Sequence, residues 1–208
     1  MIFAILVAAA LTVDPAAGNS KFDAVFDAPL GEKIDAMSSA VSCSITYDAV
    51  GGAQGSCSVP LTSIMVDNEP TKTEHFQQWA TNKKTSPKNC KIEATLSDVK
   101  AEPVLLSEKE SKIKGEAAFT VCGKGRSDGG REKLTGTALK TADGKVRLRV
   151  RVEHFNRDQY KVGPKYTEGW LQRVQQLAPV VAEEGAIDIS LFAKTQDTTD
   201  ETKTPAKP

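Results

Sequence analysis

The chain is dominated by segments in which hydrophobic and polar residues alternate. In the clearest one, residues 145–155, four aliphatic residues alternate with three arginines and a glutamate. An alternation with a period of two is typical of a β-strand with one buried and one exposed face. The same alternation predicts strands at residues 21–28, 41–47, 56–66, 91–99, 112–121, 132–141 and 185–193, and a short strand at 160–162. About eight strands separated by turn residues predict an all-β sandwich or barrel.

Two segments have helical spacing instead. Residues 74–79 place Phe76 and Trp79 three positions apart, which puts both on one face of a short helix. Residues 168–177 carry a hydrophobic stripe that includes Trp170. Phe76 and Trp79 could form the mouth of an apolar cavity or plug one end of a barrel, and the sequence leaves both interpretations open.

The two ends of the chain differ from its centre. The apolar run at residues 2–13 has the length of a signal-peptide core and is too short to span a bilayer. We therefore predict a signal peptide at residues 1–18, a barrel domain at 19–194 and a disordered polar tail at 195–208. Because no Lys or Arg precedes the apolar run, an uncleaved anchor and a buried N-terminal strand remain alternatives. Export by a bacterium would place the protein in the periplasm or outside the cell.

The balance of charge argues against two classes of partner. Lys plus Arg and Asp plus Glu both number 27, so the formal net charge is zero. A neutral chain without a basic block has little electrostatic attraction for nucleic acid or for an anionic membrane surface. We therefore expect no nucleic-acid partner and no stable membrane insertion. The row Arg147, Arg149 and Arg151 could contact an anion, but its aliphatic opposite face makes a solvated exterior the better interpretation.

The four cysteines suit an exported protein, and no pair has the CxxC spacing of a metal or redox motif. Cys43 and Cys57 lie at equal distances from a turn between them, so an antiparallel hairpin would place them opposite each other. Cys90 and Cys122 are placed in the same way about a polar connection. Opposed residues have Cβ atoms about 4.5–5.5 Å apart, close to what a disulfide tolerates. We predict the disulfides Cys43–Cys57 and Cys90–Cys122, with buried reduced cysteines as the alternative.

No catalytic constellation is present in the sequence. It lacks Ser-His-Asp, GxSxG, HExxH and phosphate-loop signatures, and its glycine-rich segment 123–130 is interpreted as a mobile hairpin loop. The histidines His75 and His154 have different flanks and are better explained as structural residues than as metal ligands or bases. We therefore expect a protein that is not an enzyme and that needs no metal or other cofactor.

Three motifs occur in a fixed order along the chain. The first is SVPLTSI at residues 58–64 followed by KTEHF at 72–76, the second lies at 113–123 and the third at 155–162. They resemble the V-P-x-x-S-I and R-D-x-H-L segments, the G-x-L-T-L-H-G strand and the N-R-x-D-F/Y-G-V element of the YceI-like, polyisoprenoid-binding family. The resemblance covers residues 22–193.

The resemblance implies an eight-stranded antiparallel lipocalin-like β-barrel with one or two short helices. Its lumen would hold a long apolar lipid such as a polyisoprenoid, a quinone or a fatty-acid-like chain. An eight-stranded barrel is wide enough for side chains or one small ligand, so the fold suits this role. Lys72 and Thr73 replace an Arg-Asp pair of the family pattern and Cys122 replaces a His, which weakens the case for a conserved polar head-group contact.

Two functional hypotheses follow. In the first, the barrel binds an apolar lipid without catalysis, as a monomer or a homodimer. In the second, large side chains fill the lumen and the disulfide-stapled barrel is a structural or interaction module. Phe119 and Leu148 meeting at the axis would favour the second. The candidate residues of the lumen and its mouth are Val59, Leu61, Phe76, Trp79, Ile92, Leu96, Phe119, Val121, Val146, Leu148, Val150, Trp170, Ile187 and Ile189.

Overall fold

The computed structural model of the chain describes residues 9–48, 50–103, 109–141, 143–167 and 181–196. The helix predicted at 168–177, with Trp170, lies outside the described residues, as do all but two residues of the predicted tail.

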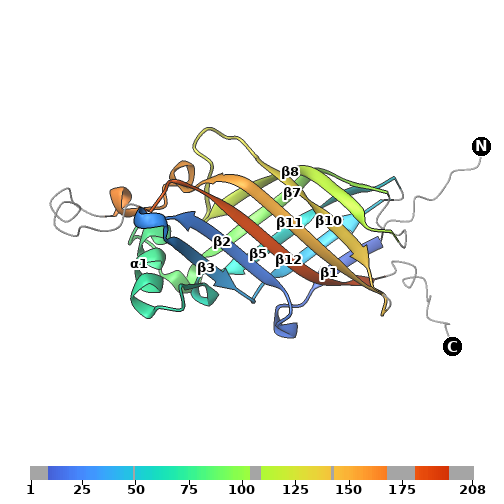
Figure 1. The fold of residues 1–208 in the computed structure, drawn as a ribbon, viewed down its shortest axis with the longest axis horizontal. Helices are drawn as coiled ribbons and strands as arrows, with labels where there is room; N and C mark the ends of the chain where they lie inside the picture. The colour runs from blue at the N-terminus through green and yellow to red at the C-terminus, as the bar shows by residue number, and fades with distance from the viewer. Residues whose placement is uncertain (1–8, 49, 104–108, 142, 168–180, 197–208) are drawn as a thin grey trace, which may run out of the picture.

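Eight strands form a closed antiparallel barrel, which confirms the predicted fold (Figure 1). In order around the ring they are β1 (Ala9–Val13), β4 (Ser42–Tyr47), β5 (Gly52–Pro60), β7 (Lys91–Glu102), β8 (Ser111–Val121), β10 (Glu132–Lys140), β11 (Lys145–Asn156) and β12 (Glu184–Gln196). Pairing of β1 with β12 closes the ring, through Ala10 opposite Gln196 and Thr12 opposite Lys194.

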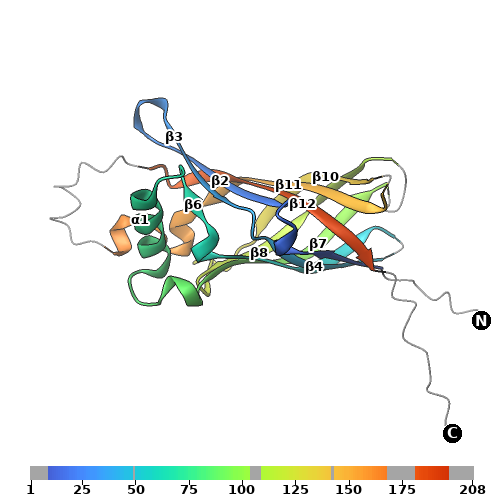
Figure 2. The same ribbon diagram turned by 90° about the horizontal axis from the view of Figure 1, so that it is seen from below.

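A side extension widens one end of this barrel. It consists of β2 (Lys21–Asp27), β3 (Lys33–Ser38) and β6 (Met65–Val66). The first half of β12, from Gly185 to Ser190, pairs with β2, whereas the last residues of β12 pair with β1. Strands β1 and β2 therefore follow one another along β12, and the extension continues the wall where β1 ends (Figure 2).

One α-helix, α1 (Pro70–Thr81), lies at the widened end (Figures 1 and 2). The buried Thr73 fixes its start, because its hydroxyl donates to the Glu69 carbonyl and accepts from the Val66 amide of β6. Asn82 ends it in the left-handed conformation, as is common at helix C-termini. The remaining short elements are β9 (Lys124–Gly125) and the 3₁₀ helices η1 (Pro15–Ala17), η2 (Pro29–Gly31), η3 (Leu61–Ser63), η4 (Pro87–Asn89), η5 (Arg157–Tyr160) and η6 (Pro164–Tyr166).

Two predicted strands are corrected by the structure. The strand predicted at 56–66 ends at Pro60, whose ring removes a backbone donor, and Leu61 lies fully buried in η3. The strand predicted at 160–162 is wrong: Tyr160 ends η5, and Lys161 has a left-handed φ of 55°. An αL residue interrupts the extended backbone that a strand requires.

Strand β3 is absent from the sequence-based prediction, and β1 corresponds there only to the alternative of a buried N-terminal strand. Strand β1 falls inside the segment interpreted as a signal peptide, yet its alternation of buried Leu11 and Val13 with less buried residues is that of a barrel strand. Removal of residues 1–18 would therefore remove the strand that closes the ring. Export, and the site of any cleavage, stay predictions.

Both predicted disulfides are present. Cys43 and Cys57 are directly opposite in the β4–β5 register, with Cα atoms 4.1 Å apart. Cys90 and Cys122 join the ends of the β7–β8 pair, with Cα atoms 4.7 Å apart. Directly opposed positions thus gave Cys43–Cys57. Cys90 and Cys122 flank the paired ends of β7 and β8 without being directly opposite, and they were also paired correctly.

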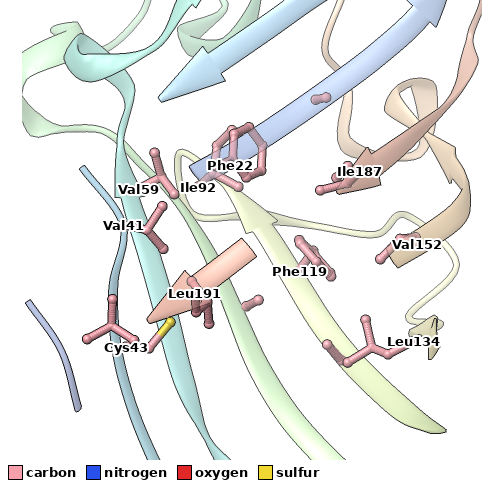
Figure 3. Close-up of a cluster of buried hydrophobic side chains, with 14 of the residues drawn as sticks. Phe22, Val41, Cys43, Val59, Ile92, Phe119, Leu134, Val152, Ile187 and Leu191 are labelled. Atoms are coloured by element: carbon pink, nitrogen blue, oxygen red, sulfur yellow. The ribbon is translucent and has the colours of Figure 1, made fainter. Parts of the chain in front are cut away.

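The barrel interior holds the hydrophobic core. Figure 3 shows side chains from well-separated strands, among them Phe22, Ile92 and Leu191, in one buried cluster. On β11 the aliphatic side chains face this interior, whereas Arg151 faces outward and pairs with Asp188 at 2.6 Å. The arginine row is thus the outer face of the barrel, as expected.

Closure by β1 can be tested with neighbouring residues of that strand. Leu11 is 1% exposed, so Leu11→Ala should lower the free energy of unfolding by about 2–5 kcal/mol. Thr12→Ala, on the opposite face of β1, should change it by less than about 0.5 kcal/mol. Urea denaturation measures both. Equal stability of the two variants would show that β1 is not part of the folded barrel.

Candidate functional site

A cavity of about 520 Å³ lies between α1, the side extension and the adjacent end of the barrel. This volume falls within the range of about 300–1,000 Å³ that is usual for small-molecule sites. Its apolar lining consists of Phe22, Ala24, Phe26, Ile34, Ala36, Val66, Phe76, Trp79, Ile92, Val121, Phe155, Val162, Val181 and Ile187. Its polar lining consists of Glu69, Thr71, Lys72, His75 and Arg157.

Small residues on the extension leave this space open. Ala24 of β2 and Ala36 of β3 are directly opposite in register, and both line the cavity. Phe76 and Trp79 face the cavity from α1 and are partly buried. They form part of its wall, which favours the mouth interpretation over that of a plug.

The other half of the lumen is filled. Its void measures only about 70 Å³ and is lined by Phe119 and Leu148, among others. The rings of Phe119 and Phe155 meet edge to face at 5.7 Å, and Phe155 stacks on Tyr160 at 4.7 Å. Since Phe119 lines the void and Phe155 the cavity, these rings lie between the two spaces.

The predicted lumen residues divide between these spaces. Those that line the cavity are Phe76, Trp79, Ile92, Val121 and Ile187. Those that line the small void are Leu96, Phe119, Leu148, Val150 and Ile189. Val59, Leu61 and Val146 are buried in the core and line neither space, and Trp170 is outside the described residues.

Several cavity residues were missed from the sequence. Phe22, Ala24 and Phe26 already alternate in a predicted strand, so they could have been included. Ile34 could not, because β3 has no clear alternation. Arg157 lies within the third motif, at residues 155–162, but nothing local indicates that it reaches a cavity.

The positive charge of Lys72, which lines the cavity from α1, is balanced by two carboxylates. Lys72 pairs with Asp67 at 2.8 Å and with Glu69 at 3.0 Å. Hydrogen bonds to these two carboxylates raise the pKa of Lys72 above its ordinary value. His75 is exposed and stacks on Trp79 with ring centroids 6.4 Å apart.

Arg157, the other cation of the cavity lining, is held by backbone carbonyls. The Arg157 guanidinium donates from Nε to Ala182 at 3.0 Å, from Nη1 to Val162 at 2.7 Å and from Nη2 to Val181 at 2.7 Å. Burial lowers the pKa of Arg157 from its ordinary value. An arginine nevertheless remains protonated in proteins, so the wall carries a positive charge here.

A buried network fixes η5, the element that carries Arg157. The Tyr160 hydroxyl, fully buried, donates to Glu132 Oε1 at 2.7 Å. The Arg126 guanidinium donates to the same oxygen at 3.0 Å. Burial of the phenol and its bond to Glu132 raise the pKa of Tyr160. The network thus connects η5 to β10.

The C-terminal end of α1 is held by the side-chain amine of Lys124. Lys124 of β9 donates from Nζ to the Ala80 carbonyl at 2.7 Å. Burial, together with the charges of Lys161 and Lys84, lowers the pKa of Lys124 to about 8. The wall that α1 contributes to the cavity is therefore bonded to the barrel at both ends.

The described residues hold no group of three His, Cys, Asp or Glu side chains that could bind a metal ion. No helix among them is long and apolar enough to cross a bilayer. His154 is exposed and bonds to Glu184 at 2.7 Å, far in sequence from His75. The geometry is that of an apolar binding cavity with a few charges at its wall.

Several solved structures are similar to this chain in fold. One is a polyisoprenoid binding domain from Saccharophagus degradans implicated in plant cell wall breakdown. It aligns with a TM-score of 0.59 and 12% sequence identity, over 91% of this chain and 99% of that chain. The likeness is one of fold, and it agrees with the eight-stranded barrel that the motifs predict. No protein-family model and no curated protein matches the sequence.

The network around η5 can be tested by removing one hydroxyl. Tyr160→Phe should lower the free energy of unfolding by about 1–3 kcal/mol, because it removes a bond to a buried carboxylate. Tyr166→Phe removes a bond to the more exposed Asp158, where water can replace it, and should have a smaller effect. Urea denaturation compares them. An unchanged Tyr160→Phe variant would show that the network does not stabilise η5.

The Lys124 contact predicts a pH dependence. Its pKa is about 8 in the folded chain against an ordinary 10.5, so between these values the unfolded chain binds more protons. Stability should therefore rise with pH across this window. Lys124→Met should remove that rise, whereas the exposed Lys133→Met should keep it. Urea midpoints at about pH 8 and about pH 10 measure it, and a Lys124→Met variant with the full rise would contradict the assignment.

Proposed function

We propose that the protein binds a long-chain apolar lipid in the cavity beneath α1 and catalyses no reaction. The ligand is a polyisoprenoid, a quinone or a fatty-acid-like chain. The observation that carries the proposal is the apolar cavity of about 520 Å³ at one end of the barrel. The structural likeness to a polyisoprenoid binding domain supports it.

The energetics of such binding require little polar chemistry. A micromolar dissociation constant corresponds to about 8 kcal/mol. At about 25 cal/mol per Å², that equals roughly 330 Å² of apolar ligand surface, before the loss of ligand freedom is counted. A long chain in an apolar cavity buries that much surface with its tail. The scarcity of reactive groups near the cavity is consistent with a carrier.

The two disulfides support an oxidising compartment, so we place the protein in the periplasm or outside a bacterial cell. The proposal concerns the cavity of one chain and applies to a monomer and to a homodimer alike.

The alternative is a structural or interaction module, and the filled half of the lumen favours it. Phe119 and Leu148 do meet around a void of only about 70 Å³ there. If this alternative is correct, the cavity beneath α1 is incidental and takes up no chain-like ligand.

Matched substitutions in the two halves separate these functions. Ala36→Leu places a larger side chain in the cavity and should weaken binding of geranylgeraniol and hexadecanol at least about tenfold, a loss of about 1.4 kcal/mol. Ala117→Leu overpacks the filled half and should instead cost about 1–3 kcal/mol of stability. Quenching of Trp79 fluorescence, absent in Trp79→Phe, reports the binding.

Two outcomes would contradict the proposal. If neither neutral chains nor their anionic analogues change the fluorescence of the unaltered protein, the interaction-module alternative replaces the proposal. Equal loss of affinity in Ala36→Leu and Ala117→Leu would place the ligand elsewhere than beneath α1.

A further inference from the structure

Arg157 is a cation in the cavity wall that forms no ion pair with a carboxylate among the described residues. Three of the five N–H groups of a guanidinium donate here to main-chain carbonyls of 162, 181 and 182. Those carbonyls are neutral, so they satisfy hydrogen bonds without balancing the charge. Two N–H groups have no acceptor among the described residues, and the side chain lines the cavity.

The two carboxylates that attract Arg157 electrostatically form ion pairs with another cation. Asp158 and Glu183 both pair with Lys165, the second at 3.2 Å. Neither forms an ion pair with Arg157 within the part of the chain that the structure describes. Lys72, the other cation of the cavity lining, provides the contrast, because two carboxylates balance it.

The surroundings make this imbalance unfavourable. Phe155, Val162 and Val181 are among the apolar neighbours of Arg157 around the cavity. Arg157 is half-buried, and taking a charge partly out of water costs free energy unless an opposite charge and hydrogen bonds compensate it. Burial lowers the pKa of this guanidinium, and the charges of Glu183 and Asp158 offset that shift only in part.

The backbone holds the guanidinium in a fixed position. A Cβ atom at Gly163 would lie only 2.2 Å from Nη1, so only glycine permits this approach. The φ of Gly163 is 151°, which also favours glycine. Together with its three carbonyl acceptors, this packing fixes the side chain before any ligand arrives, which lowers the entropy lost on binding.

We propose that Arg157 binds the anionic head group, a phosphate or a carboxylate, of a single-chain lipid whose tail lies in the cavity beneath α1. The inference rests on the proposed function and adds the chemistry of the head group. The planar guanidinium suits both anions because its N–H groups match their oxygens in a charge-assisted pair.

Ligand pairs that share a tail test the head group on the unaltered protein. Geranylgeranyl phosphate is compared with geranylgeraniol, and palmitic acid with hexadecanol, by Trp79 fluorescence. At least one anion should bind about tenfold or more tightly than its alcohol, and high salt should reduce the difference. The tighter anion distinguishes a prenyl phosphate from a fatty acid as the source.

Alcohols that bind as tightly as both anions would overturn the role of Arg157 and leave lipid binding intact. Absence of binding by all four compounds would overturn the proposed function as well. The two failures are therefore distinguishable.

Variants then assign the preference to one residue. Arg157→Gln should reduce the anion preference at least about fivefold, and Arg157→Lys should restore part of it, because charge is kept. Arg151→Gln, on the outer face of β11, is the matched control and should keep the full preference. An unchanged preference in folded Arg157→Gln would overturn the assignment. If that variant does not fold, the ligand comparison on the unaltered protein still decides the head-group chemistry.

Discussion

The narrow interior of an eight-stranded barrel is the constraint on which the rest of this structure depends. Such a barrel has room for its own side chains or for one small ligand, so the size of the inward residues decides which it holds. Phe119 and Phe155 fill one level and leave a void of about 70 Å³ beyond them. Ala24 and Ala36 leave space at the other end, where the cavity is about 520 Å³. One half of the barrel is thus a packed core, and the other half encloses a cavity.

Strand β12 makes the cavity possible because it pairs with different strands along its length. Its last residues pair with β1 and close the ring, whereas its first half pairs with β2, the first strand of the extension. The wall therefore widens at one end, and α1 covers that end. Bonds from Thr73 and Lys124 connect the two ends of α1 to the barrel. The cavity is a consequence of this pairing and of the small residues on the extension.

Much of the fold could be predicted from the sequence because one face of each strand is buried. The alternation on β11 gave both the strand and its outward arginines, and opposed positions gave Cys43–Cys57. Strand β1 was predicted only as an alternative, because a short apolar segment suits an export signal as well as a strand. The position of the cavity depends on which strands share β12, and the place of Arg157 depends on contacts with residues 181–182. Neither is a local property of the sequence.

The central claim is that the space beneath α1 holds a lipid chain. Its most direct test is native mass spectrometry of the protein isolated from its source without detergent or organic solvent, repeated after solvent extraction. We expect a species heavier than the bare chain, whose extra mass is lost on extraction and recovered as a single-chain lipid. A mass that equals the bare chain before and after extraction, with no lipid in the extract, would contradict the claim.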